Sequence, residues 1–461
     1  MNRIILHIDV NNAYLSWSAV YMLKNGYKED IRYKYAIIGG DESLRRGIVL
    51  AKSLPCKKKG VITGESIYNA RRKCPYLDVY KPNFDIYRKY SDLMYNYLCT
   101  YSNIIERYSI DECFLDYTDS YKLFGDPVKI AYKIKNDIKK NLGFTVNVGV
   151  GNNKLLAKMA SDFSKPDKVH TLFLNEIENK MWPLDVADLF MIGRSSTKKL
   201  KELNINTIYD LAHTDIDFLV RHFKSMGKMM WEYANGIDNS LVEYKKRDAK
   251  SISNSTVLPY NYANKVDIYK VLKMLSMDIG RKLRDKKLYA YKVGIWIKYA
   301  DFVKVSKQIK LKNCINTDDD IYKTATSLFD LLWNGEKVRA LCVDISDFTS
   351  HNEIQLDIFN SSDNKIMWKR DDKKLQSVVD SIRNKYGNNA IMYADDVKKN
   401  NHRWCMIIFL NKDAISSSKF IQFHINNLLY LFHIFIIIRW YTPEFNIIRI
   451  KSNAKFIIYL F

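Results

Sequence analysis

The first 170 residues alternate between short apolar runs and amphipathic stretches, in an order that few sheet topologies can accommodate. Ile4–Ile8 is apolar and rich in isoleucine, which predicts a strand, whereas Ile130, Ile134 and Ile138 repeat with the helical period. The expected elements are, in chain order, a strand at 4–8, a helix at 12–23, two short strands within 103–117, a helix from Asp126-Pro127 to Gly143, a strand at 146–150 and a helix at 155–163 that ends by Pro166.

This β-α-β-β-α-β order is that of the split ferredoxin-like arrangement, an α+β fold. Asp9 ends the first strand, Asp111 and Glu112 lie between the two short strands, and the topology places those strands side by side. Three converging carboxylates repel one another unless divalent cations neutralise them, and two Mg²⁺ ions would also activate an attacking hydroxyl and hold a leaving phosphate. Considered alone, an Asp-Glu pair in a turn is more often simply solvated.

The charge of the chain predicts an anionic partner. Lys and Arg number 73 against 51 Asp and Glu, a net charge of +22. Within residues 245–313 there are 18 Lys and Arg and five Asp, so this segment alone carries +13. Nucleic acid and an anionic membrane are the natural counter-surfaces, and a merely solvated surface is the alternative.

The cysteines and the apolar runs indicate a cytoplasmic protein. Seven scattered cysteines without a Cys-x-x-Cys pair argue against a zinc ribbon or a disulfide framework and fit a reducing compartment. Asp9 interrupts any signal-peptide core near the start of the chain. The apolar run at residues 428–438 is about half the length that a bilayer span needs, so no membrane association is expected.

Short helices and then a basic strand are expected after residue 184. Ile192-Gly193-Arg194 followed by 197–200 resembles a helix-hairpin-helix, whose backbone amides grip DNA phosphates. Residues 292–298 alternate as a strand within the basic segment, and a basic sheet is suited to tracking a phosphate backbone.

Three motifs, in order and at the expected spacing, resemble the Y family of translesion DNA polymerases over about residues 1–350. The segment 109–116, Ser-Ile-Asp-Glu-Cys-Phe-Leu-Asp, is similar to that family's S-I-D-E-x-x-L-D signature. Residues 8–14 resemble its first metal motif, and residues 145–166 resemble its strand-to-helix motif. The resemblance implies a template-directed, Mg-dependent, low-fidelity DNA polymerase that acts in translesion synthesis and DNA repair on primer–template DNA and a dNTP.

The resemblance also implies roles for single residues. Asp9 and Asp111 would bridge two Mg²⁺ ions, with Glu112 and the Val10 carbonyl completing the shell. Tyr14 falls at the steric gate that excludes a 2′-hydroxyl, and its alternative is a core aromatic. Lys57 and Lys165 would bind the triphosphate, whereas Lys154 would meet backbone phosphate or face solvent.

Some residues depart from the family pattern without affecting the three carboxylates. Leu54 and Lys57 stand where many members have Tyr and Arg, and Lys loses the bidentate fork that grips a phosphate. Ser18 replaces an acidic residue that often follows the gate by four positions. Met191 replaces a hairpin glycine, so a distorted or weaker helix-hairpin-helix is expected.

A second motif predicts a protein partner. Gln355-Leu356-Asp357-Ile358-Phe359 resembles the peptide that bacterial polymerases insert into the sliding clamp. Leu356 and Phe359 would fill apolar pockets, and Gln355 would supply a hydrogen bond that sets the register.

The expected organisation is a ferredoxin-like palm with small fingers, a helical thumb and a basic α/β little-finger domain, in a chain that acts as a monomer. The boundaries are 1–30 and 76–170 for the palm, 31–75 for the fingers, 171–242 for the thumb, 243–350 for the little finger, 351–401 for a linker with the clamp-binding peptide, and 402–461 for an atypical apolar tail. That tail shows no steady period of 3.6 or 2 and is expected to be dispensable.

Two other classes stay open at this point. A non-catalytic DNA- and clamp-binding protein could keep the fold, but such a protein has no need of three mutually repelling carboxylates. Another two-metal palm enzyme, such as a nucleotidyl cyclase, would leave the thumb-like and basic segments without a purpose. A membrane-attached role has only the apolar tail in its favour.

Overall fold

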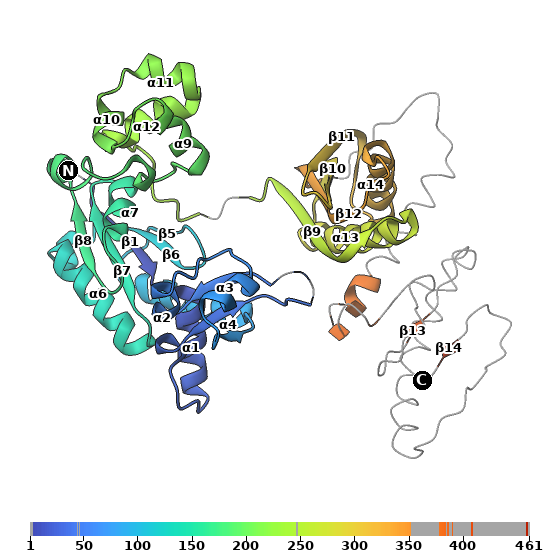
Figure 1. Cartoon of the computed structure of the whole chain (residues 1–461), viewed down its shortest axis with the longest axis horizontal. Coiled ribbons are helices and arrows are strands. Elements are labelled where there is room, and N and C mark those ends of the chain that lie inside the picture. The colour runs from blue at the N-terminus through green and yellow to red at the C-terminus, as the bar shows by residue number, and fades with distance from the viewer. Residues whose placement is uncertain are drawn as a thin grey trace. The chain divides into compact units, whose positions relative to one another are not determined.

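The computed structural model describes residues 3–43, 45, 47–245, 248–351, 378–383, 385–386, 390, 407–408 and 458–459. The chain divides into two compact units, Met1–Asp248 and Ala249–Phe461, each with its own sheets and core (Figure 1). The peptide at 355–359 lies outside the described residues. Of the apolar tail, only β13 (Ile407–Ile408) and β14 (Ile458–Tyr459) are described, and they pair with each other in antiparallel fashion.

A five-stranded sheet forms the centre of the first unit, with the strand order β5-β6-β1-β7-β8. β1 is antiparallel to both β6 and β7, as the split ferredoxin-like order predicts, and β8 adds a parallel strand beside β7 that the sequence reading did not include. The strands are β1 (Ile5–Val10), β5 (Ile105–Arg107), β6 (Glu112–Asp116), β7 (Val146–Gly151) and β8 (Val169–Leu172).

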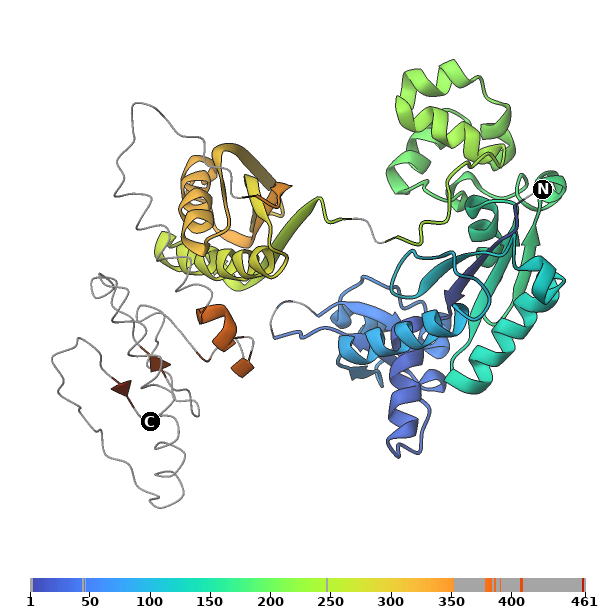
Figure 2. The same ribbon diagram turned by 180° about the vertical axis from the view of Figure 1, so that it is seen from behind.

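The two faces of this sheet have different tasks. Leu6, Ile8 and Val10 of β1 point into the main apolar core, which they share with α1, α4 and α6. The alternate residues, His7 and Asp9, therefore face the opposite side, where α7 packs. The helices around the sheet are α1 (Ala13–Lys24), α4 (Phe84–Leu98), α5 (Tyr121–Phe124), α6 (Pro127–Leu142) and α7 (Lys154–Asp162) (Figure 2).

Two smaller parts complete the first unit. A three-stranded sheet of order β3-β2-β4 interrupts the larger fold between α1 and α4, and a cluster of short helices follows β8. The first part contains β2 (Ala36–Gly39), β3 (Val49–Lys52), α2 (Leu54–Lys58), α3 (Ile67–Lys73) and β4 (Asp78–Tyr80). The second contains α8 (Ile177–Lys180), α9 (Arg194–Glu202), α10 (Ile208–His213), α11 (Ile216–Phe223) and α12 (Ser225–Ala234).

The second unit is a four-stranded antiparallel sheet, of order β11-β10-β12-β9, with α13 and α14 sharing its apolar core. Val293, Ile295 and Ile297 of β10 are buried in that core, so the alternation predicted for residues 292–298 is present. The elements are β9 (Ser251–Tyr262), α13 (Lys265–Asp285), β10 (Tyr289–Tyr299), β11 (Lys304–Ile315), α14 (Asp318–Leu332) and β12 (Val338–Thr349). Among the described helices, none combines the length and apolarity required for a bilayer span.

A buried charge network ties residues 378–383 to the second unit. The Arg284 guanidinium donates to Asp318 Oδ1 at 2.8 Å and to both carboxylate oxygens of Asp380, at 2.6 and 3.0 Å. Asp318 is 3% exposed and Asp380 7%, so the network is almost sealed from water. Gly280 permits this arrangement, because a Cβ there would lie 2.2 Å from Asp318 Oδ1. Part of the stretch that we expected to be a linker is thus helical and packed against α13.

We predict that Arg284→Met lowers the stability of the second unit by about 3–5 kcal/mol, because it removes a guanidinium that two buried carboxylates share. Calorimetric unfolding of the full chain measures the loss. The control is Lys282→Met, two residues earlier on α13 and exposed, which should change stability by no more than about 0.5 kcal/mol. Equal unfolding temperatures for the two variants would contradict the prediction.

Candidate active site

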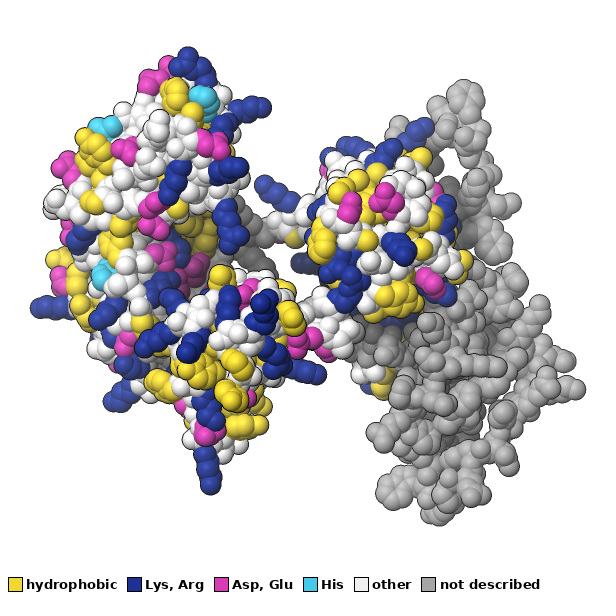
Figure 3. All heavy atoms as spheres, in the orientation of Figure 1, with side chains coloured by type: hydrophobic (Ala, Val, Ile, Leu, Met, Phe, Trp, Pro, Cys, Tyr) yellow, Lys and Arg dark blue, Asp and Glu magenta, His cyan; other side chains and the backbone are white. Residues whose placement is uncertain are grey.

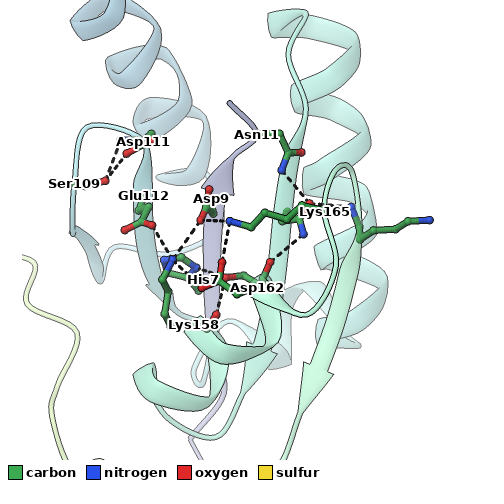
Figure 4. A network of polar contacts seen from close by, with 12 residues as sticks. His7, Asp9, Asn11, Ser109, Asp111, Glu112, Lys158, Asp162 and Lys165 are labelled. Atoms are coloured by element: carbon green, nitrogen blue, oxygen red, sulfur yellow. Dashed lines mark hydrogen bonds and ion pairs between the residues drawn. The ribbon is translucent and has the colours of Figure 1, made fainter. Parts of the chain in front are cut away.

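The strand register brings the predicted carboxylate residues to one place. Asp9 near the end of β1 is directly opposite Glu112 at the start of β6. The Val10 N–H donates to the carbonyl of Asp111 at 3.0 Å, which fixes the turn before β6 against β1. The two neighbouring strands therefore place Asp9 beside Glu112, and Asp111 lies in the turn directly before β6 (Figure 4).

Two lysines stand among these carboxylates. The Lys158 ammonium lies 2.7 Å from Glu112 Oε1 and 3.3 Å from Asp9 Oδ2. Lys165 lies 2.8 Å from the same Asp9 oxygen, and both lysines also pair with Asp162. Sequence reasoning had placed Lys165 near the site but had missed Lys158 and Asp162. Their signal was helical spacing, because residues 158 and 162 are one turn apart on α7.

The Asp111 carboxylate does not join this cluster. Its Oδ1 accepts a hydrogen bond from the Ser109 hydroxyl at 2.6 Å, and Figure 4 shows it turned towards Ser109. The local reason is that Asp111 lies in the turn before β6, where a serine two residues earlier can reach its side chain. The structure thus brings together Asp9 and Glu112, but only the backbone of Asp111.

Burial and neighbouring charges shift the ionisation of the site. Burial raises the pKa of Glu112, Lys158 lowers it, and the charges of Asp9 and Asp111 add to the rise. For Lys158, burial opposes the charged form, but Asp9, Glu112 and Asp162 outweigh that cost and raise its pKa. His7, fully buried beneath the site, has its pKa lowered well below the ordinary value by burial, by Lys158 and by Lys165.

The donor set suits a hard divalent cation. Carboxylate and carbonyl oxygens are the ligands that Mg²⁺ takes, and Asp9, Glu112, Asp111 and the Val10 carbonyl supply only oxygens. Asp9 and Glu112 already direct one oxygen each at a single cationic group, the Lys158 ammonium. Among the described residues, no group of three or more His, Cys, Asp and Glu side chains is gathered into a ready-made metal cluster.

Glycines let α7 come close enough to reach the carboxylates. A Cβ on Gly149 of β7 would lie 2.0 Å from the carbonyl oxygen of Ala157, and a Cβ on Gly151 would lie 2.7 Å from the backbone nitrogen of Ala157. Neither backbone atom can move aside while α7 and β7 keep their hydrogen bonds. Gly149 and Gly151, on the face of β7 that packs against α7, thus set how closely this helix approaches the sheet, and with it the position of Lys158.

Tyr14 stands at the N-terminus of α1 and is half-buried. Its ring stacks on Tyr87 with centroids 4.7 Å apart, and the Tyr87 hydroxyl is 2.9 Å from Ser18 Oγ. Burial and the charge of Asp111 raise the pKa of the Tyr14 phenol. Ser18, where an acidic residue is common, therefore holds the aromatic neighbour that supports Tyr14.

The other expected phosphate ligands, Lys57 and Lys154, differ in their surroundings. Lys57 is exposed on α2, and Leu54, at the start of that helix, is 49% exposed. Lys154 neither faces solvent nor is free for a phosphate, because it pairs with Glu106 at 2.7 Å and is only 14% exposed. Met191 adopts a left-handed φ of 71°, which is strained for a residue other than glycine, and α9 begins at Arg194.

Known proteins are similar to this chain in sequence. The chain matches the impB/mucB/samB family over residues 8–162 and the C-terminal domain of that family over residues 249–358. It is 47% identical to a DNA polymerase IV of Clostridium acetobutylicum over 394 residues, 85% of this chain and 98% of that protein. DNA polymerase IV 1 of Bacillus subtilis is 32% identical over 91% of this chain and 99% of its own length.

The fold has solved counterparts as well. A structure of a Y-family DNA polymerase chimera of Dbh and Dpo4 superposes with a TM-score of 0.66 at 24% identity, covering 76% of this chain and all of that one. This likeness confirms the expected α+β multidomain fold.

The fold and the matches define the chain as a member of the impB/mucB/samB family, the Y-family translesion DNA polymerases. It is a DNA-directed DNA polymerase. The alternatives of a non-catalytic binding protein and of a nucleotidyl cyclase are thereby set aside.

We predict that Gly149→Ala destabilises the first unit by at least about 1–3 kcal/mol, the usual cost of overpacking, because the added methyl meets backbone and not a flexible side chain. Urea unfolding followed by circular dichroism measures the shift in midpoint. Gly193→Ala is the matched control, since a Cβ there meets no atom within 4 Å, and its effect should stay under about 1 kcal/mol. Equal losses of stability in both variants would contradict the prediction, because they would show that a methyl group between β7 and α7 has no specific effect.

Proposed function

We propose that this polymerase is Mg-dependent and of low fidelity, and that it acts in translesion synthesis and DNA repair. The observation that carries the proposal is the register of β1 and β6, which sets Asp9 opposite Glu112 with the backbone of Asp111 bonded to Val10. Such a carboxylate-bearing strand pair is suited to phosphoryl transfer, in which positioning and charge stabilisation provide most of the catalysis.

The residues of the site would divide the work among them. Asp9, Asp111, Glu112 and the Val10 carbonyl would hold two Mg²⁺ ions. When bound, the ions would activate the primer 3′-hydroxyl and neutralise charge on the phosphates. For Asp111 this role requires its side chain to exchange the Ser109 hydroxyl for a metal ligand position. Lys57 and Lys165 would bind the triphosphate of the incoming dNTP.

A basic surface on the second unit supports the binding of primer–template DNA. Lys292, Trp296 and Lys298 alternate on β10 with the buried residues and so lie on the face opposite α13 and α14. The Lys304 ammonium stands 4.4 Å above the Trp296 ring. Figure 3 shows further Lys and Arg side chains across the visible face of this unit, with few acidic ones among them. Lysines gathered on one face of a sheet are suited to binding a phosphate backbone.

The remaining parts of the proposal come from the sequence. Gln355, Leu356 and Phe359 would bind the sliding clamp, and residues 402–461 would be dispensable for activity. We further propose the assigned boundaries of palm, fingers, thumb and little finger, a monomeric enzyme and a cytoplasmic location.

The direct test is primer extension with purified protein. Extension should require dNTPs and a divalent cation, and Asp9→Asn, Asp111→Asn and Glu112→Gln should each slow it by on the order of 10³-fold, about 4 kcal/mol of barrier, while DNA binding persists. Asp92→Asn, which alters an exposed carboxylate on α4, should extend primers at the wild-type rate. Wild-type rates in all three site variants would refute the proposed site.

Tyr14→Ala tests the steric gate. Removal of the ring should raise the incorporation of ribonucleotides relative to deoxyribonucleotides by about 10–100-fold, because the clash with the 2′-hydroxyl is relieved. Single-nucleotide incorporation with dNTP and NTP measures the ratio. Tyr21→Ala removes an exposed tyrosine from the same helix and should leave the ratio unchanged. An unaltered ratio in Tyr14→Ala would make Tyr14 a core aromatic only.

A further inference from the structure

Lys158 is the residue of the site whose role no motif explains. Its ammonium contacts carboxylates from three elements, namely Asp9 of β1, Glu112 of β6 and Asp162 of its own helix α7, at 3.3, 2.7 and 3.3 Å. The side chain is only 10% exposed, and Asp9 is 9% exposed. Figure 4 shows the lysine reaching up from α7 into the space between the two strands. One buried cation thus touches two of the proposed metal ligands.

The surrounding structure holds this lysine in place. The Ser161 hydroxyl donates to the Lys158 carbonyl at 2.7 Å, and His7 Nδ1 lies 2.8 Å from the same Ser161 oxygen. Because the serine proton is already committed to the carbonyl, His7 Nδ1 is the donor in that contact. This chain of bonds links the backbone of α7 to β1, two residues before Asp9. Gly149 and Gly151 of β7 allow the same helix to pack closely against the sheet.

Charge makes such a lysine necessary. Asp9 and Glu112 are opposite each other and partly buried, and two like charges in a poorly hydrated place repel strongly. A divalent cation would offset that repulsion only after it has bound. Lys165 pairs with Asp9 and Asp162, whereas Lys158 pairs with both Asp9 and Glu112, so Lys158 is the cation that the two opposed carboxylates share in the metal-free enzyme.

We propose that Lys158 is a built-in counter-ion that holds Asp9 and Glu112 in place before a divalent cation binds, and that it competes with that cation for them. Lys158 is a positioning residue in this scheme. The inference rests on the proposed function, because it takes Asp9 and Glu112 as metal ligands. It predicts that Lys158 stabilises the metal-free enzyme more than the metal-bound enzyme.

The test compares the melting temperatures of four full-length proteins, namely wild type, Lys158→Met, Lys154→Met and Asp9→Asn, in EDTA and in increasing Mg²⁺. Lys158→Met should melt at least about 5 °C below wild type in EDTA, because Glu112 loses the ammonium paired with it and Asp9 keeps only Lys165. Mg²⁺ should restore most of that loss, and its apparent affinity, read from the Mg²⁺ dependence of the melting temperature, should be about tenfold tighter than for wild type. If Lys158→Met does not fold in EDTA, it is purified in excess Mg²⁺ and titrated with EDTA, and unfolding on chelation is the expected result.

Lys154→Met is the matched control. Lys154 lies one turn earlier on α7, is comparably buried and pairs with Glu106, but it contacts neither Asp9 nor Glu112. Its loss should lower the melting temperature equally in EDTA and in Mg²⁺. The same Mg²⁺ response in Lys158→Met and Lys154→Met would overturn the counter-ion role. If wild type and Asp9→Asn both show no Mg²⁺ response at all, the proposed metal site fails instead, and the counter-ion role fails with it.

Discussion

The repulsion between Asp9 and Glu112 is the constraint around which the first unit is organised. The β1–β6 register sets these carboxylates opposite each other, on the side of the sheet away from the main core. Two opposed, poorly hydrated carboxylates are tolerated only where cations lie close by, and Lys158 of α7 and Lys165, just after that helix, meet this need. The glycines of β7 follow from the same requirement, because α7 must lie almost in contact with the sheet for Lys158 to reach.

Strand β1 contributes residues both to the apolar core and to the candidate active site. Its even-numbered residues, Leu6, Ile8 and Val10, anchor the apolar core, and its odd-numbered residues, His7 and Asp9, line the site. The period of a strand separates the two sets without any further device. Leu6, Ile8 and Val10 pack with α1, α4 and α6 on the opposite side of the sheet, so the site face of β1 can carry charged residues.

Departures from the family pattern have local structural answers. Ser18 bonds the tyrosine that stacks on Tyr14, so that position contributes to the aromatic support of the proposed gate. Met191 takes up the left-handed backbone that a glycine would adopt more easily, and α9 begins three residues later, at Arg194. In the second unit, Gly280 makes room for the buried pair of Arg284 and Asp318.

Sequence patterns were sufficient for the elements with strong periods and for the residues in contiguous motifs: the strands around Asp9 and Glu112, the Ile130–Ile138 helix face and the basic strand at 292–298. They were not sufficient for Lys158, for the Lys154–Glu106 pair or for Asp380 on Arg284. Each of these contacts joins residues 46 or more positions apart, except that between Lys158 and Asp162. The sequence does not distinguish a helical lysine that faces water from one that pairs with a carboxylate. Only the packing of that helix against its sheet decides which charged group lies next to the lysine.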